Sequence, residues 1–107
     1  MDAHGCRADA LRSLEALQAV FARLVSELTL HPLGEPVWHR FPDPGGITGL
    51  LALRESHLAC HTFPERRYAA FSFYCCRPRE AWPWSERLRE LLGTERVEMR
   101  AVERGSR

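Results

Sequence analysis

The stretch FPDPGGITGLLALRESHLACHTFPERRYAAFSFYCC, from Phe41 to Cys76, decides the fold. It contains three short, mostly apolar segments that predict strands: Ile47–Leu53, Leu58–Phe63 and Tyr68–Cys76. The proline and glycines of Asp43–Gly46 predict a turn before the first segment, and the polar Pro64–Arg67 predicts another before the last. Connections this short favour antiparallel pairing of neighbouring strands.

Amphipathic helices flank this central region. From Ala8 to Leu30 apolar residues recur at spacings of three and four, which predicts a helix with one face for a core. Ser85 predicts the cap of a second helix, Glu86–Leu92, and Gly93 predicts its end. Two further strands are expected at Pro36–Phe41 and Arg96–Val102. The pattern predicts a single α+β domain, 1–107, built as a two-layer sandwich of an antiparallel sheet with helices packed on one face.

Composition and charge exclude several classes of protein. Lys and Arg total 15 and Asp and Glu total 14, so the basic excess of a nucleic-acid-binding surface is missing. No stretch approaches the ~20 apolar residues that cross a bilayer. The N-terminal MDAHGCRADA lacks the basic and apolar segments of a secretory signal. We therefore expect a cytoplasmic protein with reduced cysteines that binds neither nucleic acid nor membranes.

Nucleophilic side chains gather in the middle of the chain. In ESHLACHTFPE a serine follows a glutamate, and a histidine follows that serine five residues later: Glu55, Ser56 and His61. Serine, histidine and a downstream cysteine suggest covalent chemistry, but the usual catalytic triads do not have this spacing. The neighbouring cysteines form no C-x-x-C pair, so no metal site is predicted.

The chain resembles the bacterial and archaeal S-adenosylmethionine decarboxylases. The family form is roughly E-S-H-x-x-x-H-T-W-P-E, followed by Y-A-A and a cysteine at the end of that strand. The similar segments here are Glu55-Ser56-His57-Leu58, His61-Thr62-Phe63-Pro64-Glu65, Tyr68-Ala69-Ala70 and Cys76. Upstream, Gly46-Ile47-Thr48-Gly49-Leu50 resembles the family's G-V-S-G segment. The likeness covers Pro36 to Cys76 well and the flanking helices loosely.

The resemblance implies a proenzyme that cuts itself between Glu55 and Ser56, giving a beta chain of residues 1–55 and an alpha chain of residues 56–107. In the family the serine hydroxyl attacks the preceding carbonyl and forms an ester. Loss of the serine α-proton eliminates the ester and leaves dehydroalanine, which hydrolyses to a pyruvoyl group. His61 matches the processing histidine, a base for the elimination. Thr48 stands where the family has the serine that donates a hydrogen bond to the oxyanion.

The pyruvoyl group acts in the family as an electron sink, which forms a Schiff base with the substrate amine while carbon dioxide leaves. Cys76 matches the cysteine that returns a proton to the α-carbon, whereas Cys75 would face the other side of a strand. The resemblance also implies Glu65, Phe41 and Leu58 as residues that bind the substrate.

The implied substrate is S-adenosylmethionine, and its decarboxylated product would supply spermidine biosynthesis. The family's small members pair as dimers with active sites near the subunit interface. We therefore expect a homodimer of cleaved protomers, which is a heterotetramer of two alpha and two beta chains.

Several alternatives stay open. Family relatives that keep the serine, histidine and cysteine act on arginine or ornithine, so a basic amino acid is a second substrate class. A non-cleaving paralogue that regulates an active enzyme is a third interpretation, although the intact catalytic set counts against it. Single residues also have ordinary structural interpretations: His57 as a hydrogen-bonding residue, Cys60 and Cys76 as core residues, Thr48 as a strand threonine and Glu65 as a turn carboxylate.

The chain departs from the family pattern at three places. Phe63 replaces a common tryptophan, and Ser72 replaces a common aspartate. The family's first strand is reduced to a short tail at about His4–Cys6. The short tail predicts that an edge of the sheet is lost or shortened.

Overall fold

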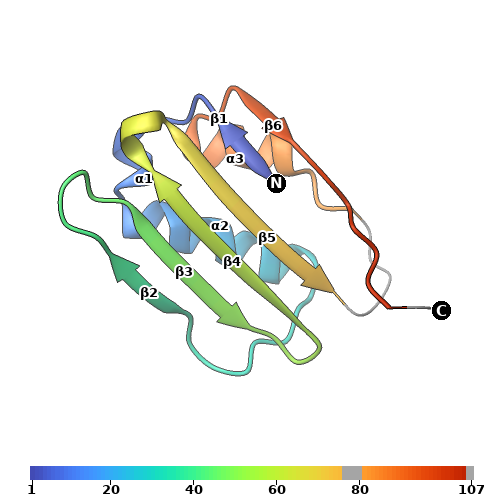
Figure 1. The fold of residues 1–107 in the computed structure, drawn as a ribbon. Helices are drawn as coiled ribbons and strands as arrows, with labels where there is room; N and C mark the ends of the chain where they lie inside the picture. Colours follow the sequence, from blue (N-terminus) through green and yellow to red (C-terminus); the bar gives the residue numbers. More distant parts are fainter. Residues whose placement is uncertain (76–80, 106–107) are drawn as a thin grey trace.

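The structure is a computed structural model, and it describes residues 1–75 and 81–105. Over these residues the chain forms one six-stranded sheet with the α-helices on one of its faces (Figure 1). The elements, in chain order, are β1 (Asp2–His4), α1 (Ala8–Leu11), α2 (Leu14–Glu27), β2 (Val37–Arg40), β3 (Ile47–Ala52), β4 (Ser56–Phe63), the 3₁₀ helix η1 (Pro64–Arg66), β5 (Tyr68–Cys75), α3 (Trp84–Leu92) and β6 (Arg96–Glu98). The predicted α+β sandwich is confirmed.

The strands lie in the order β2-β3-β4-β5-β1-β6, and every neighbouring pair is antiparallel. The longest ladder joins β4 to β5 and runs from Ser56 opposite Cys75 to Phe63 opposite Tyr68. β3 and β4 are joined by a tight turn, in which the backbone N–H of Leu53 donates to the carbonyl of Ser56 at 3.0 Å. Ser56 is therefore already the first residue of β4, two residues earlier than the apolar pattern predicts.

The N-terminal helical region differs from its prediction. Instead of one helix there are two, because Ser13 interrupts the pattern and caps α2, its side chain accepting the N–H of Ala16 at 3.1 Å. In α3 the predicted cap is wrong as well, since the helix begins at Trp84 and Ser85 lies within it. Gly93 ends α3 as predicted, with the positive φ of 67° that glycine adopts without strain.

The two ends of the chain meet in the sheet. β1 lies between β5 and β6, so the prediction that its shortening affects a sheet edge is wrong, although the strand has only three residues. β6 forms the edge and spans Arg96–Glu98 rather than the predicted Arg96–Val102. The N-terminal segment is therefore held on both sides.

The core lies between the helices and the sheet. Leu58, Cys60 and Thr62 of β4 alternate along the strand and are buried on the side of the helices. They meet the apolar faces of α1, α2 and α3, to which the largest contributions are Leu11, Leu17, Val20, Leu24, Leu88 and Leu92. None of the described helices is both long and apolar enough to span a bilayer.

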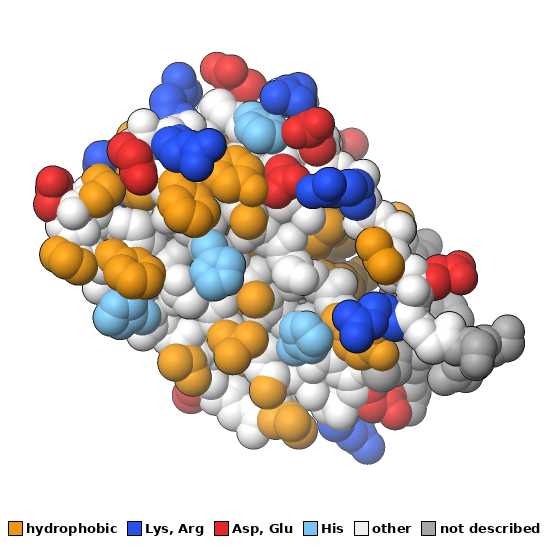
Figure 2. All heavy atoms as spheres, in the orientation of Figure 1, with side chains coloured by type: hydrophobic (Ala, Val, Ile, Leu, Met, Phe, Trp, Pro, Cys, Tyr) orange, Lys and Arg blue, Asp and Glu red, His pale blue; other side chains and the backbone are white. Residues whose placement is uncertain are grey.

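The other side of the sheet carries no helix of the described chain, and we call it the open face. Its side chains include Thr48, Leu50, His57, Ala59, His61, Phe63, Tyr68, Ser72 and Tyr74. Figure 2 shows this side, where hydrophobic and histidine side chains are interspersed over the strands. Thr48 and His61, two of the residues that the sequence places in the covalent chemistry, are on this face, and Glu55 lies in the turn that borders it, whereas Ser56 begins β4 with the parity of the helix side.

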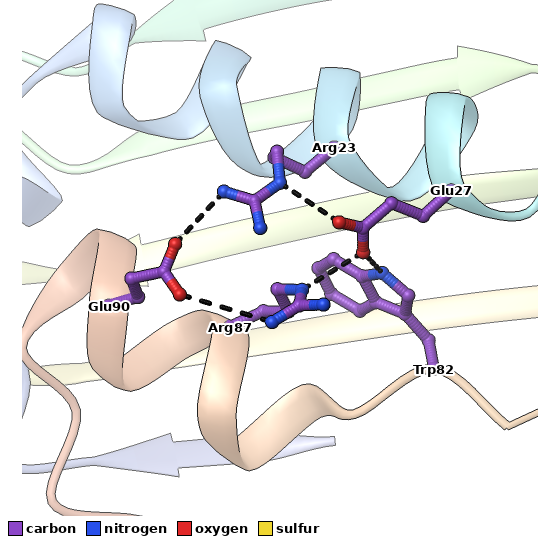
Figure 3. A network of polar contacts seen from close by, with 5 residues as sticks. All are labelled: Arg23, Glu27, Trp82, Arg87 and Glu90. Atoms are coloured by element: carbon purple, nitrogen blue, oxygen red, sulfur yellow. Dashed lines mark hydrogen bonds and ion pairs between the residues drawn. The ribbon is translucent and has the colours of Figure 1, made fainter.

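A polar network joins the helices on the opposite side of the molecule (Figure 3). The Glu27 carboxylate accepts hydrogen bonds from Trp82 at 2.7 Å and from Arg87 at 2.9 Å, and it pairs with Arg23. Arg23 also donates to Glu90 at 3.0 Å, which closes a bridge between α2 and α3. The hydrogen bonds from Arg87 and then Trp82 lower the pKa of Glu27 to about 2.

Candidate active site

Thr48 and His61 form a side-chain pair on the open face. They are direct partners in the ladder between β3 and β4, so their side chains project from the same side of the sheet. The Thr48 hydroxyl oxygen lies 3.0 Å from Nδ1 of His61. The sequence resemblance gives these two residues neighbouring roles, and the structure brings them together.

The contact suggests how the proton of the imidazole would be arranged for base chemistry. If Nδ1 carries the proton, it donates to the Thr48 oxygen and leaves Nε2 with a lone pair that can accept a proton. The hydroxyl proton of Thr48 is then available to a second acceptor. One hydrogen bond can thus orient a base and a donor at the same time.

A pocket of about 280 Å³ opens beside this pair. Phe41 and Glu65, which the resemblance names as substrate-binding residues, line it together with Thr48 and His61. The remaining lining residues are Pro44, Gly46, Thr62 and Phe63. Aromatic walls with a single carboxylate suit a flat ring that carries polar or cationic groups.

Phe63 is a pocket residue that the sequence analysis did not assign. Its ring is 37% exposed at the end of β4 and stacks on Tyr68, with centroids 5.6 Å apart and planes at 20°. Tyr68 is held in turn, because its hydroxyl donates to Asp2 at 2.5 Å. Phe63 stands at the motif position where the family commonly has a tryptophan, and this position is the signal that could have identified it as a functional aromatic.

Ser56 is not part of the pocket. It lies at the opposite end of β4, and five residues of extended strand separate it from His61 by about 17 Å. Because five is an odd number, strand alternation also directs the two side chains to opposite faces of the sheet. A single copy of the chain therefore does not bring the predicted base to the predicted cleavage site.

The predicted cleavage bond itself is accessible. Glu55 lies in the tight turn between β3 and β4 and is exposed, and Ser56 is half-buried.

The cysteines differ in their positions. Cys76, the predicted acid, lies outside the described residues. Cys75 is opposite Ser56 in the ladder and alternates with Phe71 and Phe73, which places it on the helix side of β5. Cys60 is fully buried in the core, as expected, and burial raises the pKa of its thiol to about 12.

Two other residues of the E-S-H-L segment lie away from the pocket. Leu58 has no exposed surface and lies in the core on the helix side, so the structure does not bring this predicted substrate-binding residue to the pocket residues. His57 is exposed on the open face and stacks on Tyr74, with centroids 5.4 Å apart.

Comparison with known proteins shows the family to which the chain is similar. A family model described as S-adenosylmethionine decarboxylase matches residues 1–105. The S-adenosylmethionine decarboxylase proenzyme of Geobacillus kaustophilus is 32% identical over 105 residues, which cover 96% of this chain and 82% of that protein. The proenzyme of the same name from Pelotomaculum thermopropionicum is 31% identical over 102 residues, covering 94% of this chain and 79% of its own.

Proposed function

Because the chain belongs to the S-adenosylmethionine decarboxylase family, an enzyme family, we propose that it is a pyruvoyl-dependent S-adenosylmethionine decarboxylase that cuts itself between Glu55 and Ser56. The observation that carries the proposal is the Thr48–His61 pair, which lies at 3.0 Å beside an aromatic pocket. The product would be decarboxylated S-adenosylmethionine, a donor for spermidine biosynthesis.

Self-cleavage would use Thr48 in its first step and His61 in its second. The hydroxyl oxygen of Ser56 attacks the carbonyl carbon of Glu55, the Thr48 hydroxyl donates to the oxyanion, and the Ser56 nitrogen leaves as an amine, which gives an ester. Nε2 of His61 then accepts the α-proton of Ser56. The bond from the Ser56 β-carbon to the ester oxygen breaks, so that residue 55 leaves as a carboxylate.

The sheet would hold the two products together. A cut before Ser56 ends one chain just after β3 and begins the other with β4, and these strands remain paired from Thr48 opposite His61 to Ala52 opposite His57. Single-domain organisation would therefore survive cleavage into residues 1–55 and 56–107. This position also fits a pyruvoyl group at the head of β4, which when present supplies the electron sink for decarboxylation.

Protonation of the substrate α-carbon would fall to Cys76. On the strand before it, Cys75 alternates with residues that face the helices. Replacement of Cys76 by alanine should therefore stop turnover but leave self-cleavage, whereas Cys75→Ala should retain both.

The distance between Ser56 and His61 favours a dimer in which each copy completes the other. In a pair of sheets stacked face to face, a two-fold axis lying between them and running across β4 places the Ser56 end of one copy over the His61 end of its partner. The sheets would be about 10 Å apart. Both copies would then bring the Thr48–His61 pair near the exposed turn that holds the partner's Glu55–Ser56 bond.

The character of the open face supports this arrangement. Val37, Phe41, Leu50, Phe63 and Tyr74 all project from it and are 37–68% exposed in one copy. Large apolar side chains gathered on one side of a small protein are typical of an interface. A cleaved homodimer, or heterotetramer of two alpha and two beta chains, would cover them.

The pocket favours S-adenosylmethionine over the alternative substrates. Phe41 and Phe63 offer faces for a purine, and Glu65 can accept hydrogen bonds from a ribose diol. Arginine and ornithine carry no ring that would use these walls. The same carboxylate could pair with their distal cation, however, so the second substrate class is tested directly.

The test compares release of labelled carbon dioxide from carboxyl-labelled S-adenosylmethionine, arginine and ornithine by the purified protein. The proposal predicts turnover of the first and at most trace release from the others. Turnover of a basic amino acid alone would change the assigned substrate but would leave the assignment as a decarboxylase in place. A full-length, uncut and inactive chain would instead favour a regulatory paralogue.

A further inference from the structure

Thr62 is a buried polar residue to which the proposed reaction gives no role. It follows His61 in the H-T-F-P-E motif and is 5% exposed on the helix side of β4. Its hydroxyl oxygen accepts the backbone N–H of Ile47 at 2.9 Å and donates to the carbonyl of Leu11 at 2.8 Å. One side chain thus joins β4 to the start of β3 and to the end of α1.

The backbone is closely packed at this point. A Cβ atom on Gly46 would lie 2.5 Å from the Thr62 carbonyl oxygen, so the chain entering β3 passes directly against β4. At this close approach, the backbone N–H of Ile47 donates its hydrogen bond to the Thr62 hydroxyl. Both bonded backbone groups are in the interior, where an unpaired polar group is costly.

These bonds lie next to the Thr48–His61 pair. Thr48 follows Ile47, and His61 precedes Thr62, so the bonded residues and the pair are neighbours along both strands. The side chains of Ile47 and Thr62 project from the helix side of the sheet, and those of Thr48 and His61 project from the open face. A shift of β3 against β4 beneath the pair would change the contact of 3.0 Å above it.

We infer that Thr62 is a positioning residue for self-cleavage: its hydroxyl holds the ends of β3 and β4 in the register that orients His61 through Thr48. The inference rests on the proposed function for its kinetic consequence. Its structural consequence, the geometry and tautomer of the His61 imidazole, exists in the uncut chain as well. The two can therefore be tested separately.

The kinetic test follows cleavage of precursor labelled during cell-free synthesis, with rates normalised to folded protein. Thr62→Val keeps the shape but removes both hydrogen bonds, and it should slow cleavage about tenfold or more, as loss of orientation does. Thr62→Ser keeps both bonds and should cut within about twofold of the parent. Thr62→Cys has a weaker hydrogen-bonding group of similar size and should be intermediate.

Thr94→Val is the matched control. Thr94 is also buried, at 2% exposed, and its hydroxyl contacts Cys6 at 3.2 Å between α3 and β6, away from the pair. Its replacement should lower the thermal midpoint but leave the cleavage rate of the folded protein unchanged. Equal slowing by Thr62→Val and Thr94→Val would overturn the positioning role and leave only a structural one.

The second readout is the ¹⁵N spectrum of the His61 imidazole in a Ser56→Ala background, in which cleavage is impossible. Addition of Thr62→Val should shift the two ring-nitrogen signals toward a mixture of tautomers, and Thr62→Ser should restore the parental positions. Unchanged signals would refute the inference even if the parent never cuts itself. Failure of the parent to cut, with shifted signals, would refute self-cleavage alone. If Thr62→Val does not fold, the comparison of Thr62→Cys with Thr62→Ser decides both readouts.

Discussion

Thr48 and His61 face each other across β3 and β4 with their hydroxyl oxygen and Nδ1 3.0 Å apart, and both line the pocket on the open face. The pair is complete within one copy of the chain. The pair does not reach its proposed target, the Glu55–Ser56 bond, within the same copy, because Ser56 lies at the other end of β4. The proposal that two copies assemble the site rests on this separation.

Removal of the proposed base should nearly stop self-cleavage. His61→Ala should slow the reaction about 100-fold or more, as loss of a positioned acid–base group does. Thr48→Val should slow it by a similar factor, whereas Thr48→Ser should retain most of the rate because it keeps the donor. Cleavage is measured on denaturing gels during cell-free synthesis. His39→Ala, which removes another exposed histidine paired in the ladder with Thr48, is the control and should cut normally.

Mixed dimers should show cleavage between subunits. In a dimer of one Ser56→Ala chain and one His61→Ala chain, the intact Ser56 meets the partner's intact His61, so only the His61→Ala chain should be cut. Each variant alone should stay whole. The chains carry different tags and are purified through both tags before electrophoresis. An uncut His61→Ala chain in the mixed dimer would exclude the arrangement proposed here.

Loss of the second aromatic wall should weaken substrate binding. Phe63→Leu should raise KM for S-adenosylmethionine about tenfold with a smaller change in kcat, because stacking on a base contributes about 1–3 kcal/mol. Phe63→Trp should bind at least as well as the parent. Leu33→Ala removes an exposed apolar residue outside the pocket and serves as the control. Equal KM values for the parent and Phe63→Leu would remove Phe63 from the substrate site.

The Glu27 network should protect the fold against acid. The pKa of Glu27 is lowered from 4.5 to about 2 in the folded chain, so its contribution to stability is complete above pH 4.5 and is lost as the pH falls toward 2. Glu27→Gln should lower the thermal midpoint by a few degrees at pH 7, and the difference from the parent should shrink below pH 4.5. Thermal melts across this range, with Glu15→Gln as an exposed control in the same helix, measure the effect. A constant difference down to pH 2 would contradict this assignment.

The sequence was sufficient to predict the central strands and the layer of helices, because alternation and short turns determine antiparallel neighbours locally. It was insufficient where contacts between distant segments decide. The position of β1 between β5 and β6 depends on pairing with two strands much later in the chain, which place Ala3 between Ala69 and Val97. Ser13 and Ser85 are both residue types that favour a cap, but only Ser13 caps a helix, because α3 begins at Trp84, one residue before Ser85.

The candidate site could be predicted in its residues but not in its geometry. The family resemblance implied roles for Thr48, His61, Phe41 and Glu65, and these residues line one pocket. The resemblance implied His61 as the base that acts on Ser56, whereas the extended strand between them separates the two residues and directs their side chains to opposite faces of the sheet. The buried position of Leu58 follows from the same alternation.

The central claim is that this chain makes its own carbonyl cofactor by cutting before Ser56, and intact mass measurement of the purified protein tests it most directly. The account predicts two chains, residues 1–55 and residues 56–107, with the second lighter than its serine-started form by one ammonia and reactive toward borohydride. A single mass for the uncut chain of 107 residues, unchanged by borohydride, would contradict it.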